Sequence, residues 1–268
     1  MTARARQRPA GWEWDIRESG PADADHTVLL LPGTLATAAF YDDLMAETRC
    51  AEASIRFVAA TLPGQGGTPP SEDLSIEGYA RLAGQLAADR GCDAVVGHST
   101  GANVAIEMAA AGDFSGPLVL LAPSFSREDE SRFPRALDRL GRVFGQLPFA
   151  AMLKVIGWAV KGGLPSDRHD ALVAELRKND PRVVRRRVRL FLEYLDRHGS
   201  VAPRLCNSGI RAWVVFGDLD DIGLTDDERR VLEDCPQVTL GTIPDVGHFT
   251  LNVVPDRVSE IVLEAVSV

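Results

Sequence analysis

One short stretch of the sequence has residue types and spacing suited to nucleophilic chemistry. Residues 97–101 read Gly-His-Ser-Thr-Gly, with Ser99 at the centre. A serine hydroxyl is a poor nucleophile unless a base takes its proton, and a sharp turn is needed to hold it clear of the backbone. Gly97 and Gly101 permit such a turn, because a Cβ at either position would crowd the neighbouring backbone. We therefore predict that Ser99 attacks a carbonyl carbon.

The residues on both sides of Ser99 predict the elements that must position it. Residues 94–97 form an apolar run typical of a strand, and residues 102–111 have an amphipathic helical pattern that ends at Gly112. The free amides at the start of that helix would lie beside Ser99, so that the Thr100 amide could stabilise a developing oxyanion. The alternative is an inert turn of small residues, and the strand–turn–helix context favours the catalytic interpretation over it.

This strand–turn–helix resembles the nucleophile turn of the α/β-hydrolase superfamily, and the resemblance extends over most of the chain. It implies an α/β fold with an eight-stranded, mostly parallel sheet, helices on both faces, and catalytic residues in the order serine, acid, histidine. Asp220 matches the acid position, three residues after Gly217, and is preferred to its neighbours Asp218 and Asp221. His248 matches the histidine position after the last strand.

The resemblance therefore implies a Ser99–Asp220–His248 triad. His248 would take the Ser99 proton, and Asp220 would orient the imidazole and stabilise its charged form. Some relatives place the acid just after the strand at residues 117–121, but the first carboxylate there, Glu128, lies too far along the chain.

A second loop is expected to complete the oxyanion site. The apolar strand at residues 27–31 is followed by Pro32-Gly33-Thr34-Leu35. In the resembled family this strand ends in His-Gly, and here Pro32 stands in place of the histidine. The second oxyanion amide, beside that of Thr100, is therefore expected from Leu35 or from Thr34.

The rhythm of strands and helices predicts a core and an insertion. Strand patterns occur at residues 12–16, 27–31, 55–60, 94–97, 117–121, 211–216 and 238–243. Residues 124–205 contain only helical patterns, at 131–146, 149–161, 166–178 and 181–197. We expect a core domain of residues 11–123 and 206–268, with residues 124–205 as a helical cap over the carboxyl edge of the sheet, where open α/β folds bind ligands.

The cap sequence gives candidates for substrate contact. Residues 147–158 contain a single charged residue and could form an apolar wall for an acyl or hydrophobic alcohol group, although such a helix can also pack on its own domain. The candidate substrate-binding residues are Phe149, Met152, Leu153, Ile156, Trp158 and Phe249. Five arginines between residues 182 and 189 are interpreted as a solvated face, with contact to an anionic substrate or a phosphopantetheine carrier as the alternative.

Composition excludes several classes of protein. The formal net charge of −9 argues against a nucleic-acid binder. Residues 1–10 are expected to be a frayed tail and not a secretory signal, and no segment has the length of a membrane span. Cys50, Cys92, Cys206 and Cys235 lack metal-ligand spacing, and we expect reduced thiols and a cytoplasmic location.

The expected reaction is cleavage of a carboxylic ester or lactone of a small hydrophobic substrate, without metal or cofactor. A thioesterase acting on acyl-CoA or an acyl-carrier protein is the main alternative, because Gly-His-Ser-Thr-Gly-Ala with Ala102 looks like the turn of thioesterases that serve polyketide or peptide synthases. Carbon–carbon hydrolysis, lyase chemistry and a non-catalytic ligand receptor are further alternatives, because the fold does not fix the function.

Overall fold

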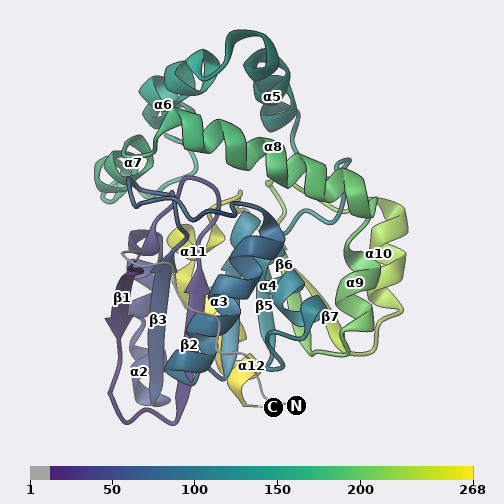
Figure 1. The fold of residues 1–268 in the computed structure, drawn as a ribbon. Helices are drawn as coiled ribbons and strands as arrows, with labels where there is room; N and C mark the ends of the chain where they lie inside the picture. Colours follow the sequence, from purple (N-terminus) through teal and green to yellow (C-terminus); the bar gives the residue numbers. More distant parts are fainter. Residues whose placement is uncertain (1–12, 268) are drawn as a thin grey trace.

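A twisted sheet of seven strands lies at the centre of the computed structural model, which describes residues 13–267 (Figure 1). The strand order is β1-β3-β2-β4-β5-β6-β7, and every pair is parallel except β1 with β3. The strands are β1 (Asp15–Ser19), β2 (His26–Leu31), β3 (Ile55–Thr61), β4 (Ala94–His98), β5 (Leu118–Leu121), β6 (Ala212–Gly217) and β7 (Val238–Ile243).

The sheet has one strand fewer than the expected eight within the described residues. The edge strand β1 is paired with β3 in the register Asp15 to Thr61, and only six residues separate it from β2, too few for a further strand and its connections. The edge strand begins at Asp15 instead of Trp12, which lies outside the described residues together with the expected N-terminal tail.

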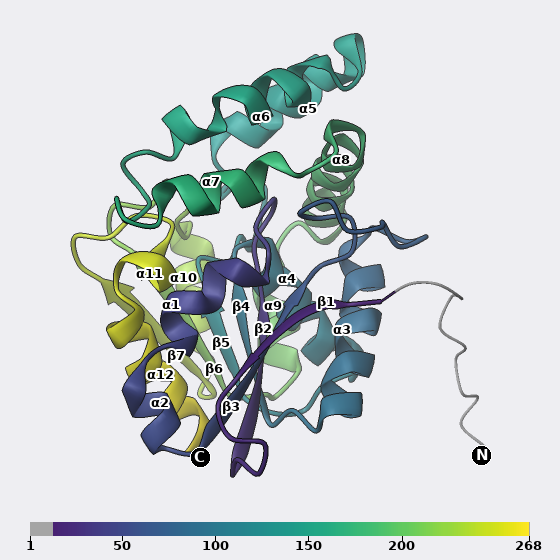
Figure 2. The same cartoon turned by 90° about the vertical axis from the view of Figure 1, so that its left-hand side faces the viewer.

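Apolar side chains on alternate residues of the strands cover both faces of the sheet. In β2, Leu29 and Leu31 belong to the core on one face, and Val28 and Leu30 belong to the core on the other. Helices α3 (Ile76–Arg90), α4 (Thr100–Ala111) and α9 (Ala202–Asn207) cover the first face. The second is covered by α1 (Asp42–Met45), α2 (Thr48–Glu52) and α12 (Pro255–Val266), and Figure 2 shows the sheet between these layers.

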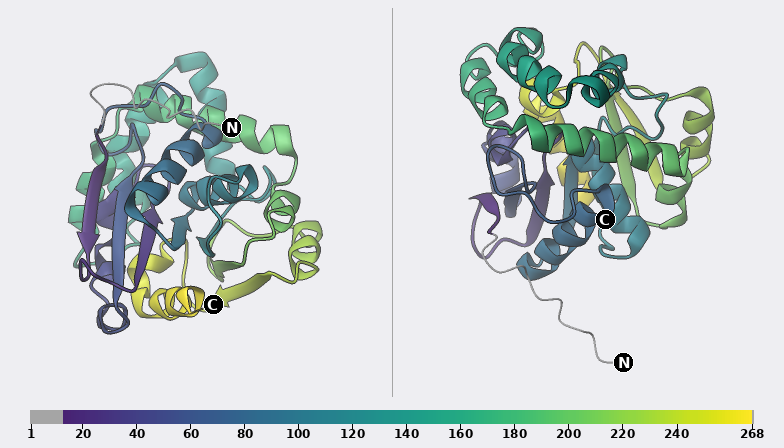
Figure 3. Two further views of the ribbon diagram at one scale, coloured as in Figure 1. Left: turned by 60° about the horizontal axis from the view of Figure 1, so that its bottom comes forward. Right: turned by 45° about the horizontal axis from the view of Figure 1, so that its top comes forward.

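Four helices from the segment between β5 and β6 lie across the carboxyl ends of the strands, as Figures 1 and 3 show. They are α5 (Arg132–Phe144), α6 (Leu147–Ala159), α7 (His169–Arg177) and α8 (Pro181–His198). The base of this segment is closed where Ser126 pairs with Ser200 and the Val201 amide donates to the Phe125 carbonyl. Beyond that base, α9 returns to the core layer beside α4.

Local signals explain where α8 begins and how it is anchored. The Asp180 side chain accepts a hydrogen bond from the Arg182 amide, and Pro181 occupies the first turn, so the helix begins at the predicted residue. The expected solvated arginine face is not uniform, because Arg187 is buried with its guanidinium 5.2 Å from the centre of the Tyr79 ring of α3. Even α8, with 18 residues, does not combine the length and apolar character needed to cross a membrane, and no other helix among residues 13–267 does.

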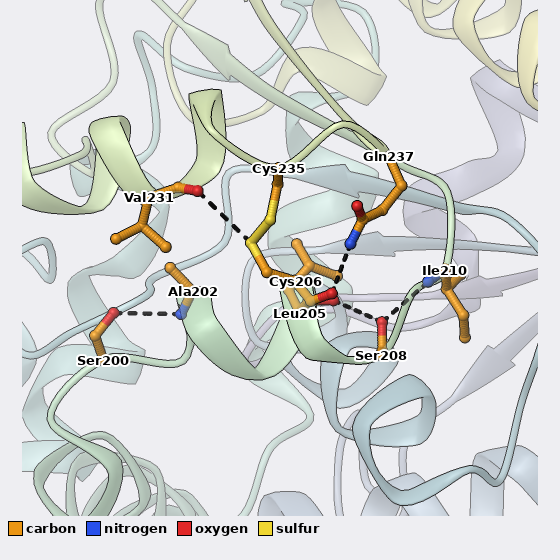
Figure 4. The surroundings of a disulfide bond; sticks show 9 residues. All are labelled: Ser200, Ala202, Leu205, Cys206, Ser208, Ile210, Val231, Cys235 and Gln237. Atoms are coloured by element: carbon orange, nitrogen blue, oxygen red, sulfur yellow. Dashed lines mark hydrogen bonds between the residues drawn. A yellow bond between two sulfur atoms is a disulfide. The ribbon is translucent and has the colours of Figure 1, made fainter.

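The expectation of four reduced thiols is wrong for two of them. Cys206 at the end of α9 and Cys235, just after α10 (Asp226–Glu233), form a disulfide with their Cα atoms 5.8 Å apart (Figure 4). They are 29 residues apart in sequence, and only the packing of α9 beside α10 brings them together. Cys50 and Cys92 are free. Since disulfides persist mainly in oxidising compartments, the cysteines no longer support the expected cytoplasmic location.

Candidate active site

Ser99 stands on a sharp turn between β4 and α4. Its backbone has φ 52° and ψ −122°, a combination that side chains rarely adopt. The amide of Ser99 donates to the Leu121 carbonyl at 2.8 Å, which ties the turn to the neighbouring strand. The glycines are needed on steric grounds: a Cβ on Gly97 would lie 2.5 Å from the Gly101 carbonyl oxygen, and one on Gly101 would lie 2.1 Å from that of Leu31.

His248 and Asp220 are joined by a hydrogen bond between the loops that follow β7 and β6. The distance from His248 Nδ1 to Asp220 Oδ2 is 2.8 Å. The Asp220 carboxyl is 2% exposed, and its other oxygen accepts from the Ile222 amide at 3.0 Å. A Cβ on Gly217 would lie 2.1 Å from the Val246 carbonyl oxygen, so the glycine allows the two loops to touch.

The neighbouring acids have other surroundings. Asp218 accepts a hydrogen bond from the Val246 amide at 3.3 Å, which braces the loop that carries His248. Asp221 is exposed. Of the three acids in this loop, Asp220 is therefore the one that faces the imidazole.

A cavity of about 610 Å³ beneath α5, α6 and α8 brings Ser99, Asp220 and His248 together. All three residues line it, although they are far apart in the sequence. Among the described residues the Ser99 hydroxyl makes no hydrogen bond, and catalytic hydrogen bonds in unliganded enzymes are often long. The arrangement has a serine hydroxyl, a carboxylate-bound imidazole and apolar walls in one space.

A second histidine supports the loop of the first. His98 Nε2 lies 2.8 Å from the backbone carbonyl oxygen of His248, and the two ring centres are 4.7 Å apart. Burial, together with the nearby charge of His248, lowers the pKa of His98 to about 3. The neutral ring of His98 therefore donates its Nε2 proton to that carbonyl. His98 lies inside the Ser99 motif, but the sequence analysis assigned it no role.

The loop after β2 lies beside the start of α4. Leu35 has a positive φ of 72°, and both it and Thr34 line the cavity. The Thr34 and Thr100 hydroxyls are hydrogen-bonded at 2.5 Å, which links the two segments. Within the described part of the chain, neither the Leu35 nor the Thr100 amide donates to a protein acceptor. These are the groups that the sequence predicts for an oxyanion site.

Asn179, between α7 and α8, holds this loop from above. Its side-chain amide donates to the Leu35 carbonyl at 2.8 Å, and its oxygen accepts from the Gly66 amide at 3.2 Å. The side chain is buried and connects the helices over the sheet with two core loops. The sequence analysis places Asn179 only between two helical patterns, because the contact to Leu35 spans 144 residues.

Comparison with known proteins agrees with this fold. The sequence profile of the alpha/beta hydrolase family matches residues 28–261. The chain belongs to this family. Comparison of the hydrolase with curated protein sequences gives no match.

Solved structures resemble the hydrolase over nearly its whole length. The N-acyl homoserine lactonase AidH, complexed with N-butanoyl homoserine, has a TM-score of 0.70 at 19% identity, covering 93% of this chain and 90% of the other. The esterase EaEST from Exiguobacterium antarcticum has a TM-score of 0.75 at 13% identity, covering 94% and 95%. The thioesterase domain from the curacin biosynthetic pathway has a TM-score of 0.69 at 17% identity, covering 92% and 94%. At these identities the likeness shows the fold alone.

The six candidate substrate contacts of the hydrolase divide into three groups. Met152, Ile156 and Phe249 line the cavity. Phe149 and Leu153 lie in the core, where Phe149 packs against Gly141 of α5. Trp158 points to the outside and is 83% exposed. Helical periodicity explains the position of Trp158, because it lies on the other face of α6 from Met152 and Ile156.

Other cavity residues were missed by the sequence analysis. Val184, Val188 and Phe191 form the apolar face of the arginine-rich helix α8, at a spacing that its periodicity could have revealed. Glu130 also lines the cavity, and its carboxylate accepts hydrogen bonds from the Ser124 hydroxyl and the Ser131 amide. Burial raises the pKa of Glu130. Glu130 reaches the cavity because the Asp129 carboxylate accepts hydrogen bonds from the Phe125 and Ser126 amides. These bonds fold the chain between Phe125 and Glu130 back on itself.

Proposed function

We propose that this hydrolase cleaves a carboxylic ester or lactone of a small hydrophobic substrate through Ser99, His248 and Asp220. The proposal depends mainly on one observation, the 2.8 Å bond of Asp220 to His248 in the same cavity as Ser99. A carboxylate on Nδ1 fixes the tautomer in which Nε2 is free to accept a proton. The Asp220 carboxyl is buried, which shields its end of this bond from water.

The proposed reaction proceeds through an acyl-enzyme. Ser99 Oγ forms a bond to the substrate carbonyl carbon while its proton passes to His248 Nε2. The amides of Thr100 and Leu35 hold the negative oxygen, and the bond to the alcohol breaks as His248 returns the proton to it. A water molecule then attacks the acyl group, again through His248, and the acid leaves. The proposed mechanism requires His248 Nε2 to come within hydrogen-bond reach of Ser99 Oγ when substrate binds.

The cavity supports a hydrophobic acyl or alcohol group. Its walls come from α5, α6 and α8 and include Leu137, Met152, Ile156 and Val188. We propose that residues 124–205 act as a cap that selects substrates by shape and excludes water. A bound N-butanoyl homoserine in a protein of the same fold supports the inclusion of lactones among the candidates.

A thioesterase is the second candidate, supported by the turn sequence with Ala102 and by the thioesterase domain of the same fold. Matched p-nitrophenyl esters and acyl-CoA thioesters of the same chain length distinguish the two. The ester proposal predicts the higher kcat/KM on the ester. A higher kcat/KM on the thioester would make the thioesterase the better-supported function.

Labelling with a fluorophosphonate tests the nucleophile. The wild-type chain is expected to be labelled at Ser99 and to lose its activity, whereas Ser99→Ala is expected to be folded, unlabelled and inactive. Ser71→Ala is a matched control, because Ser71 lies outside the cavity and bonds only within its own loop. Absence of labelling in the wild-type protein would contradict the hydrolase proposal and favour a non-catalytic receptor.

A further inference from the structure

The outer surface of α5 has an apolar sector beside a basic one. Phe133, Leu140 and Phe144 recur on one side of the helix, and all three are exposed. Val143 extends this sector and is 74% exposed. The adjoining side of the helix carries basic residues, namely Arg132, Arg135, Arg139 and Arg142. Only Leu137, Asp138 and Gly141 of this helix are buried.

Helix α6 continues the apolar surface. Leu147 and Trp158 lie on its outer face and are 65% and 83% exposed, with Val155 beside them. We call the seven exposed apolar side chains on the two helices the cap patch: Phe133, Leu140, Val143, Phe144, Leu147, Val155 and Trp158. Figures 1 and 2 show both helices at the end of the molecule furthest from the amino ends of the parallel strands. A soluble surface rarely exposes so many large apolar residues together unless they bind something.

The charges around the cap patch indicate what it binds. Residues 131–161 contain six basic residues and one acidic residue in a chain of net charge −9. The single acid, Asp138, is buried and pairs with Arg142 and Arg189. The exposed charge of this segment is therefore entirely positive, which suits an anionic surface and disfavours contact between the same segments of two copies, because they carry like charge.

The cap patch is also continuous with the cavity. Phe133 belongs to the patch and lines the cavity, and Leu219 and Val253 are further cavity residues that are exposed. An apolar path therefore leads from the outer surface of α5 to the space that contains Ser99. A hydrophobic molecule could enter along this path without first dissolving in water.

We propose that the cap patch docks the protein on an anionic phospholipid surface. Apolar side chains of α5 and α6 enter the boundary between headgroups and acyl chains, while the arginines contact the lipid phosphates. Exposed tryptophan, phenylalanine and leucine beside lysine and arginine are the composition of an interfacial helix. An acidic carrier protein would use the same charges, but its contact would not need seven exposed apolar residues beside them.

Vesicle flotation with the full chain tests the proposal. The wild-type protein is expected to float with vesicles of equal parts phosphatidylglycerol and phosphatidylcholine, and far less with phosphatidylcholine alone. Val143→Ser/Phe144→Ser removes apolar contacts and is expected to reduce binding at least about tenfold. Arg132→Glu/Arg139→Glu is expected to do the same for the anionic vesicles. Val231→Ser, an exposed apolar residue on α10, is the matched control and should bind like wild type.

Further measurements make the result decisive. Circular dichroism checks that each variant is folded, and binding needs no enzymatic activity, so failure of the docking proposal is separate from failure of the hydrolase proposal. Equal flotation of the wild-type and both double variants, or no flotation of the wild-type, would overturn the docking site. It would also be overturned if the cap patch mediated dimerisation in size-exclusion chromatography, or bound an acidic acyl-carrier protein, without binding vesicles.

Discussion

The ring of His98 packs against that of His248 at 4.7 Å while its Nε2 proton bonds to the His248 backbone carbonyl. His98 thereby holds the backbone of the residue whose ring is bonded to Asp220. Because the pKa of His98 is lowered to about 3, this donor stays neutral and in place over the whole pH range in which an imidazole base works.

We expect His98→Phe to lower kcat about tenfold or more with little change in KM, since the ring packing remains but the donor is lost. The acid limb of the pH–rate profile should have the same shape in both proteins, because His98 stays neutral there. Steady-state kinetics from pH 4 to pH 9 provide the measurement. A second ionisation that disappears in the variant would show that His98 itself titrates.

The acids after β6 allow a matched comparison. Asp220→Asn is expected to reduce kcat roughly 10³- to 10⁴-fold, because the amide favours the wrong imidazole tautomer. Asp218→Asn keeps an oxygen for the Val246 amide and should cost less than about tenfold. The kcat values of both variants on a p-nitrophenyl ester provide the measurement. Similar losses in the two variants would mean that Asp218 shares the role proposed for Asp220.

Asn179 should act on the rate more than on binding. Asn179→Ala removes the hydrogen bond to the Leu35 carbonyl. Leu35 has a positive φ, so without this bond the backbone of Leu35 and its proposed oxyanion amide lose their fixed position. We expect kcat to fall roughly 10- to 100-fold while KM changes less, because the oxyanion forms only after attack. Asn179→Asp keeps the shape but not the donor, and should resemble alanine. An unchanged kcat in both variants would remove Leu35 from the oxyanion site.

A pair of buried acids is expected to make stability depend on pH. Asp129 is hydrogen-bonded to Glu228, and burial followed by this contact raises the pKa of Asp129 to about 7. The folded protein therefore keeps a proton that the unfolded chain, with an aspartate pKa of about 4, releases. Protonation of Asp129 therefore stabilises the folded state. This contribution to the free energy of unfolding is fully present below pH 4 and is lost as the pH rises through 7.

Glu228→Gln tests this, because the amide can donate to Asp129 without a titrating proton. The difference in melting temperature between pH 5 and pH 8 should shrink in the variant, and the variant should be the more stable of the two at pH 8. The Thr225 hydroxyl, which bonds Glu228 at 3.0 Å, can bond the glutamine oxygen in the same way. An identical pH dependence in wild type and variant would show that the pair is not the cause.

The elements around Ser99 could be predicted because their signals are local. A strand, two glycines and a helix within 20 residues determine the turn, and Asp180 and Pro181 are equally close to the start of α8. The resemblance to a family supplied Asp220 and His248. The hydrogen bond between them depends on the contact of two loops at Gly217, which the sequence alone does not show.

The parts that could not be predicted depend on distant packing. Glu130 reaches the cavity only because the preceding loop folds back, and Asn179 reaches Leu35 only once the helices lie over the sheet. Trp158 was assigned to the cavity from composition, whereas the side of α6 that faces inward is determined by its neighbours. The disulfide needed the placement of α9 beside α10.

The bond between Cys206 and Cys235 encloses the whole segment that carries Asp220. If a protease were to cut the peptide backbone once in the exposed turn at residues 218–221, the C-terminal fragment with His248 would remain covalently attached to the fragment with Ser99. The two pieces would migrate as one chain until a reductant was added. Backbone continuity is thus not the only covalent route between the proposed base and its nucleophile.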